Sequence, residues 1–406
     1  MINTPKSLRL HIGIFGRRNV GKSSILNALV GQYVSIVSDT PGTTTDPVEK
    51  VMELKPVGPV VFIDTAGLDD IGALGKARIA QTRKVIDRTE LAVLVTDNWT
   101  EYETKLVAML REKQIPFVVA ANKRDLRKND ALETAARKAG IELLTSTTAT
   151  GSTGIDALRN LIIQATPEAF LESVPVIADL VSPGELVVLV TPIDIEAPKG
   201  RLKMLQVHCI REILDKNATL FITKETELAD VLSRLNAKPD LVVCDSQVFE
   251  KVVQIITADT PVTTFSIVMA RFKGDFETML AGTQAIDNLK PGDKVLIAEA
   301  CTHHPIGEDI GRVQIPNLLK QYAGEELKID VTAGRDFPEN LAQYKLIIHC
   351  GACVFNRAEM LTRISSARLA GVPITNYGMT IAKCRGILDR AVEIFQNTNE
   401  LIDQKS

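Results

Sequence analysis

The chain has 406 residues, which is too long for one ordinary hydrophobic core and predicts two or three domains. Hydrophobic residues make up 45% of it and charged residues 24%, and 47 basic against 50 acidic side chains leave a net charge of −3. This composition is typical of a globular protein without an electrostatic preference for nucleic acid. With neither the apolar core of a signal peptide nor an 18-residue apolar run, the sequence predicts a cytoplasmic protein that does not cross a membrane. The six cysteines should therefore stay reduced.

Short apolar runs rich in valine and isoleucine alternate with helical stretches along the whole chain, which predicts an α/β fold of three units with mainly parallel sheets. In the first unit, residues 1–168, we expect strands at 10–15, 60–63, 92–95 and 117–121. Prolines 167, 175 and 183 indicate a hinge region before the second unit, residues 176–270, with strands at 186–190, 219–223, 241–244 and 263–268. The third unit, residues 271–406, has predicted strands at 295–298, 327–331, 346–349 and 373–377 and a closing helix near 383–396. Similar spacing suggests a weak internal similarity between units two and three.

A glycine-rich phosphate-binding motif follows the first predicted strand. Gly16-Arg17-Arg18-Asn19-Val20-Gly21-Lys22-Ser23 fits G-x-x-x-x-G-K-[ST] and lies between the strand that ends at Phe15 and a helix that starts at Lys22. Backbone N–H groups and the helix N-terminus would bind the phosphates. Lys22 would contact the β and γ phosphates, and the Ser23 hydroxyl would ligate Mg²⁺. The neighbouring Ser24 is also an expected nucleotide-binding residue. A lone match of this length can arise by chance, so the other motifs decide.

Those motifs occur in the required order, each at a strand end. Asp64-Thr65-Ala66-Gly67 places Asp64 to hold Mg²⁺ through water and the Gly67 amide to sense the γ-phosphate. In Asn122-Lys123-Arg124-Asp125, the Asp125 carboxylate can accept two hydrogen bonds from guanine, which selects GTP over ATP. Ser146 or Thr147 belongs to the expected base-contacting loop, with its register open. We therefore predict that the first unit is a P-loop GTPase.

The segment Pro41-Gly42-Thr43-Thr44-Thr45-Asp46 resembles switch I of the GTPases related to Era and MnmE. The resemblance implies that Thr44 ligates Mg²⁺ and senses the γ-phosphate, so Lys22, Thr44 and Gly67 are the expected catalytic residues. Leu68 stands where Ras-like enzymes carry the glutamine that orients water, so intrinsic hydrolysis should be slow. In the resembling family Asn19 helps to bind K⁺, which would accelerate hydrolysis. The alternative is that Asn19 is a local turn residue.

Cysteines and histidines gather at two strand ends of the third unit, as Cys301-Thr302-His303 and as His349-Cys350-Gly351-Ala352-Cys353. Three cysteines with histidines suit an iron–sulfur cluster or a tetrahedral zinc site, and spacing alone does not separate the two. A C-x-x-C motif is also compatible with buried small residues or a redox pair. Cys209, Cys244 and Cys384 stand among apolar residues and are expected in the core.

Together these motifs resemble the HydF family, the maturation GTPases of [FeFe]-hydrogenase, over the whole chain. The resemblance implies a [4Fe-4S] cluster on Cys301, Cys350 and Cys353, a homodimer formed through the middle unit, and no nucleic-acid partner. It also implies that the protein acts as scaffold or carrier for the diiron precursor, with the radical-SAM maturases HydE and HydG and the apo-hydrogenase as partners. The exchangeable fourth ligand is open between His303, His349 and Glu308.

Two other functions remain open at the sequence level. One is a ribosome- or RNA-associated GTPase with a structural zinc, although the added units lack a basic patch. The other is a zinc enzyme with a Cys₃His site, although no acid/base residues are recognisable beside it. We expect the GTP switch to act on partner binding rather than on cluster chemistry.

Overall fold

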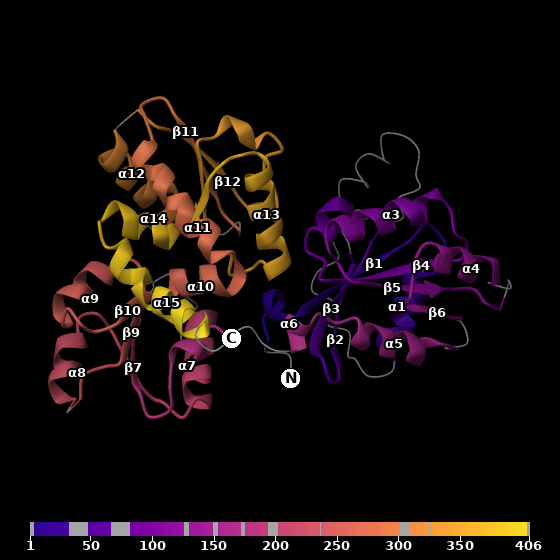
Figure 1. Cartoon of the computed structure of the whole chain (residues 1–406), viewed down its shortest axis with the longest axis horizontal. Coiled ribbons are helices and arrows are strands. Elements are labelled where there is room, and N and C mark those ends of the chain that lie inside the picture. The colour runs from indigo at the N-terminus through magenta and orange to yellow at the C-terminus, as the bar shows by residue number, and fades with distance from the viewer. Residues whose placement is uncertain are drawn as a thin grey trace. The chain divides into compact units, whose positions relative to one another are not determined.

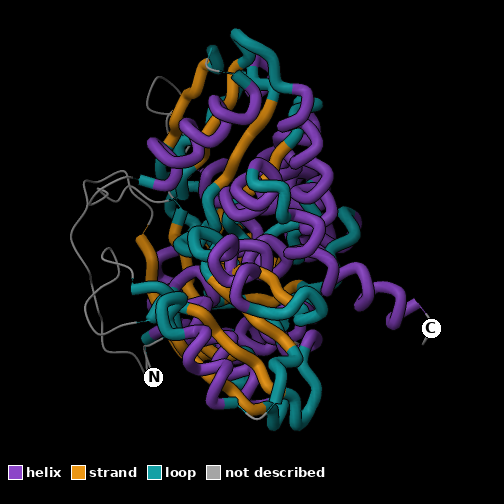
Figure 2. Tube along the Cα trace, turned by 90° about the vertical axis from the view of Figure 1, so that its left-hand side faces the viewer, coloured by secondary structure: helices purple, strands orange, loops and turns teal. Residues whose placement is uncertain are grey.

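The computed structural model describes residues 4–31, 48–65, 82–125, 130–148, 153–171, 175–193, 202–235, 237–300, 309–324 and 326–403. It divides into two compact units, Met1–Val174 and Pro175–Ser406 (Figure 1). In each unit strands lie between helices, drawn in orange and purple in Figure 2. None of the helices in the described ranges combines the length and the apolar character that crossing a membrane requires.

The first unit is built on one six-stranded sheet in the order β2-β3-β1-β4-β5-β6. β2 runs antiparallel to β3, and the other neighbours are parallel. The strands are β1 (Leu10–Phe15), β2 (Val48–Leu54), β3 (Gly58–Asp64), β4 (Leu91–Thr96), β5 (Phe117–Ala121) and β6 (Leu144–Ser146). The helices are α1 (Lys22–Val30), α3 (Glu101–Glu112), α4 (Asp130–Lys138), α5 (Ile155–Gln164) and α6 (Glu168–Leu171). Every residue of β1 and β4 is buried, because helices cover both faces of the sheet.

The second compact unit of the structure includes both the second and the third unit predicted from the sequence. It contains two four-stranded parallel sheets with the same strand order. One is β8-β7-β9-β10 and the other is β12-β11-β13-β14. The first sheet has β7 (Leu186–Val190), β8 (Thr219–Thr223), β9 (Leu241–Cys244) and β10 (Val262–Thr264), with helices α7 (Met204–Asp215), α8 (Leu228–Arg234), α9 (Phe249–Ile255) and α10 (Phe265–Lys273). The other has β11 (Lys294–Ala298), β12 (Lys328–Thr332), β13 (Leu346–His349) and β14 (Ile374–Asn376), with helices α11 (Phe276–Gly282), α12 (Ile315–Ala323), α13 (Arg357–Leu369), α14 (Tyr377–Cys384) and α15 (Leu388–Asp403).

The turns that lead into β7 and β11 are built alike, which confirms the internal similarity. Gly184 and Gly292 both have positive φ, +84° and +89°. The acidic side chain that follows each glycine accepts a hydrogen bond from a backbone N–H three residues earlier, at 2.8 Å for Glu185 and 2.9 Å for Asp293. A glycine tolerates this left-handed backbone at no steric cost, so the same sequence pattern gives the same turn twice.

Each of the two sheets is followed in sequence by a helix that packs against the other sheet. α11 follows the first sheet in sequence but packs beside β14, where a Cβ on Gly282 would clash with the carbonyl oxygen of Ile374. α15 follows the other sheet but lies beside β10, where the Thr263 hydroxyl donates to the carbonyl of Ala391 at 2.8 Å (Figure 1). One hydrophobic core contains side chains from both sheets. Residues 175–406 therefore form one compact unit, and the predicted boundary at residue 270 falls inside α10.

Most predicted strands are confirmed to within two residues, and two predictions about the second unit are wrong. The strand predicted at 263–268 ends at Thr264, whose hydroxyl accepts from the Ile267 N–H at 3.3 Å and caps α10. The closing helix is broken near Gly386, which has φ +68° and separates α14 from α15. In the first unit the antiparallel strand β2 was not predicted.

Candidate functional site

The predicted phosphate loop lies between β1 and α1, where the motif requires it. Gly16 has φ +150° and leaves no room for a Cβ against the backbone of Val95. Gly21 has φ +98°, and a Cβ there would overlap the side-chain amide of Asn122. Asn19 has φ +61° and Val20 is buried. Both glycines are therefore required by close contacts, and the loop has one defined conformation.

Lys22 folds back over this loop. Its ammonium group donates to the carbonyls of Gly16 and Arg17 at 2.8 and 2.9 Å, and the side chain is buried. The Ser23 hydroxyl donates to Asp64 Oδ2 at 2.6 Å. The other oxygen, Oδ1, is buried and has no hydrogen-bond partner among the described residues. A hydroxyl and a carboxylate in contact beside a phosphate loop are oxygen ligands of the kind that Mg²⁺ takes, so both residues fit the ion.

Asn122 connects three segments of the first unit. Its backbone N–H donates to Thr96 at 2.8 Å, and its side-chain amide donates to the Val20 carbonyl at 2.8 Å. Its side-chain oxygen accepts from the Thr147 hydroxyl at 3.2 Å. This buried asparagine therefore fixes the phosphate loop against the two loops expected to bind the base.

Those two loops lie side by side. The Thr147 N–H donates to Ala121 at 2.8 Å and the Arg124 N–H donates to Thr147 at 3.3 Å. Thr147 is fully buried and points to Asn122, whereas the Ser146 hydroxyl donates to Glu133 at 2.5 Å. Asp125 is exposed at the end of its loop. The segments 122–125 and 146–147 thus lie next to each other, and their contact with a guanine base stays a prediction.

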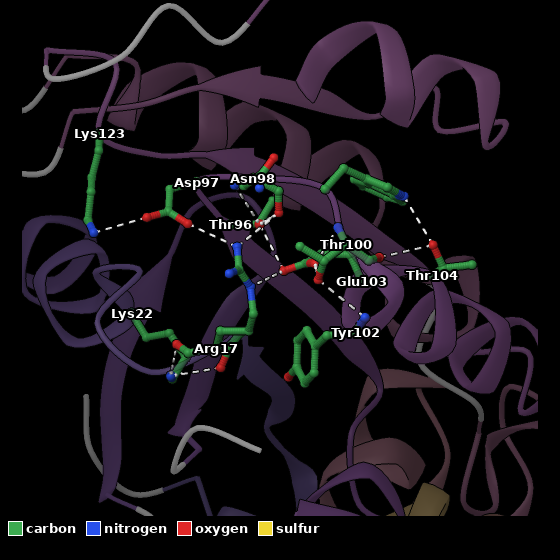
Figure 3. A network of polar contacts seen from close by, with 12 residues as sticks. Arg17, Lys22, Thr96, Asp97, Asn98, Thr100, Tyr102, Glu103, Thr104 and Lys123 are labelled. Atoms are coloured by element: carbon green, nitrogen blue, oxygen red, sulfur yellow. Dashed lines mark hydrogen bonds and ion pairs between the residues drawn. The ribbon is translucent and has the colours of Figure 1, made fainter. Parts of the chain in front are cut away.

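An ionic network that the sequence analysis missed supports the same site (Figure 3). Arg17 lies between Asp97 and Glu103, with nitrogen–oxygen distances of 3.0 and 2.9 Å, and Lys123 reaches the other oxygen of Asp97 at 3.1 Å. Glu103 is fully buried and also caps α3, where it accepts from the Thr100 N–H at 2.8 Å. The pattern Thr-x-x-Glu at 100–103 is a capping box, and it is the feature of the sequence from which the role of Glu103 at the start of α3 could have been predicted. The network joins the phosphate loop to the base-specific loop.

Part of the predicted machinery lies outside the described residues. This holds for Thr44, Gly67 and Leu68 of the nucleotide site and for Cys301, His303 and Glu308 of the expected cluster site. Within the described ranges, no group of three histidine, cysteine or acidic side chains is arranged to hold a metal ion.

The two described cysteines of the expected cluster site follow β13. Cys350 is half-buried, and its sulfur accepts a hydrogen bond from the Ala300 N–H at 3.1 Å, while Cys353 is exposed. Ala300 directly precedes Cys301 in the sequence. An N–H group directed at a sulfur stabilises a thiolate and is typical of iron–sulfur sites, so Cys350 fits the chemistry of a cluster ligand.

Cys209 and Cys244 are fully buried core residues, as predicted, and Cys384 is half-buried. Burial raises the pKa of the Cys209 thiol to about 12 and raises the pKa of the Cys244 thiol well above its ordinary value. Thiols with such pKa values stay protonated, which makes them poor nucleophiles and poor metal ligands.

Both ring nitrogens of His349 have hydrogen-bond partners. Nε2 lies 3.0 Å from Arg363 Nη1 and Nδ1 lies 2.8 Å from the carbonyl of Cys350. Because arginine only donates, Nε2 must accept, and the ring is neutral with its proton on Nδ1. Complete burial and the charge of Arg363 lower the pKa of His349 to about 3. This arrangement argues against His349 as the fourth ligand, because neither ring nitrogen has a lone pair free to bind iron.

Three family models match successive parts of the chain. Residues 11–123 match the 50S ribosome-binding GTPase model, residues 176–274 the hydrogen maturase F dimerization domain and residues 277–394 the hydrogen maturase F tetramerization domain. The chain belongs to the hydrogen maturase F (HydF) family. The predicted family is therefore confirmed, and the first unit is its GTPase domain. The dimerization and tetramerization domains of the family indicate an oligomer.

The chain is also similar to other GTPases, each over a part of its length. GTPase Der of Wolinella succinogenes is 36% identical over 130 residues, which cover 30% of this chain and 27% of that protein. The tRNA modification GTPase MnmE of Prochlorococcus marinus is 38% identical over 128 residues, with the same coverage. The chain thus spans about a quarter of the length of these relatives. The G domain of the T. maritima FeoB iron transporter is 24% identical, with a TM-score of 0.30, over 39% of this chain and 99% of that one.

Proposed function

We propose that this HydF-family chain is a GTP-hydrolysing scaffold and carrier, on which the diiron subcluster of [FeFe]-hydrogenase is assembled and from which it is delivered to the apo-hydrogenase. The observation that carries the proposal is that one chain with HydF dimerization and tetramerization domains has a nucleotide site in one unit and a cysteine loop, residues 350–353, in the other. Cys301, Cys350 and Cys353 would hold a [4Fe-4S] cluster, with His303 or Glu308 as the exchangeable ligand. When bound, the cluster would supply an iron that can accept and release cargo.

Iron analysis of the full chain after anaerobic reconstitution tests this proposal. We expect about four irons per chain, a reduced-cluster EPR signal, and loss of both in Cys353→Ala, because a cluster of this type depends on its thiolate ligands. Cys384→Ala is the matched control and should keep the cluster. Stoichiometric zinc in place of iron would instead favour a ribosome- or RNA-associated GTPase with a structural zinc, the function to which the family model of residues 11–123 refers.

In the proposed switch, Lys22 and the loop N–H groups bind the phosphates, and Thr44 and Gly67 sense the γ-phosphate. GTP can act on a partner only if the bound state changes the affinity for it, and a tenfold change needs about 1.4 kcal/mol of coupling. We propose that hydrolysis promotes dissociation from the maturases HydE and HydG. Partner off-rates measured with GTP and with a nonhydrolysable analogue should differ, and equal rates would remove this step.

We also propose that K⁺ accelerates hydrolysis. Asn19 has left-handed backbone at the phosphate loop, and asparagine is one of the few residues that adopts it readily while keeping a side-chain oxygen that can bind a cation. The rate of phosphate release should be higher in potassium chloride than in sodium chloride at equal ionic strength. Asn19→Gly keeps the backbone geometry and should abolish the difference. If the native chain hydrolyses GTP equally fast in both salts, Asn19 acts only as a turn residue.

A further inference from the structure

A buried lysine from the dimerization domain contacts the cysteine loop. Lys273 is the last residue of α10 and is 2% exposed. Its ammonium group donates to the carbonyls of Ala352, Cys353 and Phe355 at 3.2, 3.2 and 2.5 Å. The match to the dimerization model ends at residue 274 and the match to the tetramerization model begins at residue 277. The lysine and the loop that it holds therefore belong to different family domains.

The loop has a backbone conformation that needs this support. Ala352 is buried and has φ +50°, the left-handed region that alanine disfavours. Strained residues of this kind persist only where the surroundings fix them. The Ala352 carbonyl accepts both from Lys273 and from the Phe355 N–H, the latter at 3.1 Å. Because Ala352 lies between the two cysteines of the C-x-x-C motif, its conformation sets how the two sulfurs are placed.

The charge of Lys273 also lies near Cys350. Lys273 and Cys350 line one small cavity, together with Gly274, Met279 and Met360. In such an apolar surrounding the field of a buried ammonium group is weakly screened, so it favours negative charge on the cysteine loop. A cluster held by thiolates is anionic and becomes more so when reduced.

We propose that Lys273 is a positioning residue of the cluster site: it fixes the C-x-x-C loop from the dimerization domain, and its charge stabilises the bound cluster, above all in the reduced state. This inference rests on the proposed cluster function. It means that the site is incomplete without α10, so the residues matched by the tetramerization domain alone, 277–394, should not hold a cluster with native properties.

The test compares reconstituted full-length variants. In Lys273→Met the reduction potential should become more negative, and a chelator should remove iron about tenfold faster, which corresponds to about 1.4 kcal/mol. Lys273→Arg, which keeps the charge, should restore the potential. Lys383→Met, which removes a lysine paired with Asp287 elsewhere in the unit, should match the native chain. If circular dichroism shows that Lys273→Met is unfolded, Lys273→Gln supplies the neutral side chain with two N–H donors.

The outcomes separate the two proposals. A native chain that takes up no iron would reject the proposed function and this inference with it. A native chain with a cluster, beside a folded neutral variant with the same potential and the same rate of iron loss, would reject only the role of Lys273. A shifted potential that Lys273→Arg does not restore would leave the hydrogen bonds to the loop, rather than the charge, as the cause and would refute the electrostatic part.

Discussion

Replacing Glu103 by alanine should lower the free energy of unfolding of the GTPase domain by about 3 kcal/mol, because a buried hydrogen-bonded carboxylate and a helix cap are lost together. The carboxylate is fully buried and accepts from Arg17 and Thr96, each at 2.9 Å, as well as from Thr100. Without it, the Arg17 guanidinium loses an ion-pair partner beside the phosphate loop. We therefore also expect weaker GTP binding.

The chain offers both a probe and a matched control for this experiment. Trp99, the one tryptophan, donates to Thr104 at 3.2 Å in the same helix start, so its fluorescence during urea unfolding of the full chain reports on this domain. Glu101→Ala removes a carboxylate from the same turn, but an exposed one that pairs with Lys105, and should leave the unfolding curve unchanged. Equal curves for the two variants would mean that Glu103 has no special role.

The sequence predicted the strands well because parallel strands that are buried on both faces are read directly from unbroken apolar runs. β5 and β9 have the predicted bounds, and all residues of β9 are buried. β2 was not predicted because it is an edge strand. Most of its side chains are partly or fully exposed, so its sequence contains no apolar run. The end of β10 was misplaced because its capping residue, Thr264, is followed by apolar helix residues that continue the pattern.

The parts of the site that could be predicted are those with a fixed spacing along the chain. The phosphate loop, Asp64 and Asn122 each occur in a short motif, and the structure brings them together. Lys273 carries no such motif, because its partners lie up to 82 residues away in sequence. Glu103 does occur in a short motif, the capping box, but its ion pair with Arg17 joins residues 86 positions apart and could not be predicted from it. The packing of α11 beside β14 and of α15 beside β10 could not be predicted either, because these contacts also join distant parts of the sequence. Helical periodicity shows which face of a helix is apolar but does not show which sheet that face covers.

Replacing Asn122 by alanine should weaken GTP binding about 100-fold, since two buried hydrogen bonds are lost and each 1.4 kcal/mol is a factor of ten. The lost bonds are those to the Val20 carbonyl in the phosphate loop and to the Thr147 hydroxyl. The side-chain amide also fills the space beside Gly21, so alanine would leave a gap there. Titration of a fluorescent guanine nucleotide in the presence of Mg²⁺ measures the affinity.

Two neighbouring substitutions make this prediction specific and decide the register of the base-contacting loop. Thr147→Val keeps the shape and removes only the bond to Asn122, so it should lower the affinity by about tenfold, the effect of one such bond. Ser146→Ala removes a hydroxyl that points to Glu133, away from Asn122, and should change the affinity little. If Ser146→Ala weakened binding more than Thr147→Val, Ser146 would be the residue that contacts the base. Native affinity in Asn122→Ala would show that the phosphate loop keeps its conformation without the contacts that the asparagine makes to Val20 and Gly21.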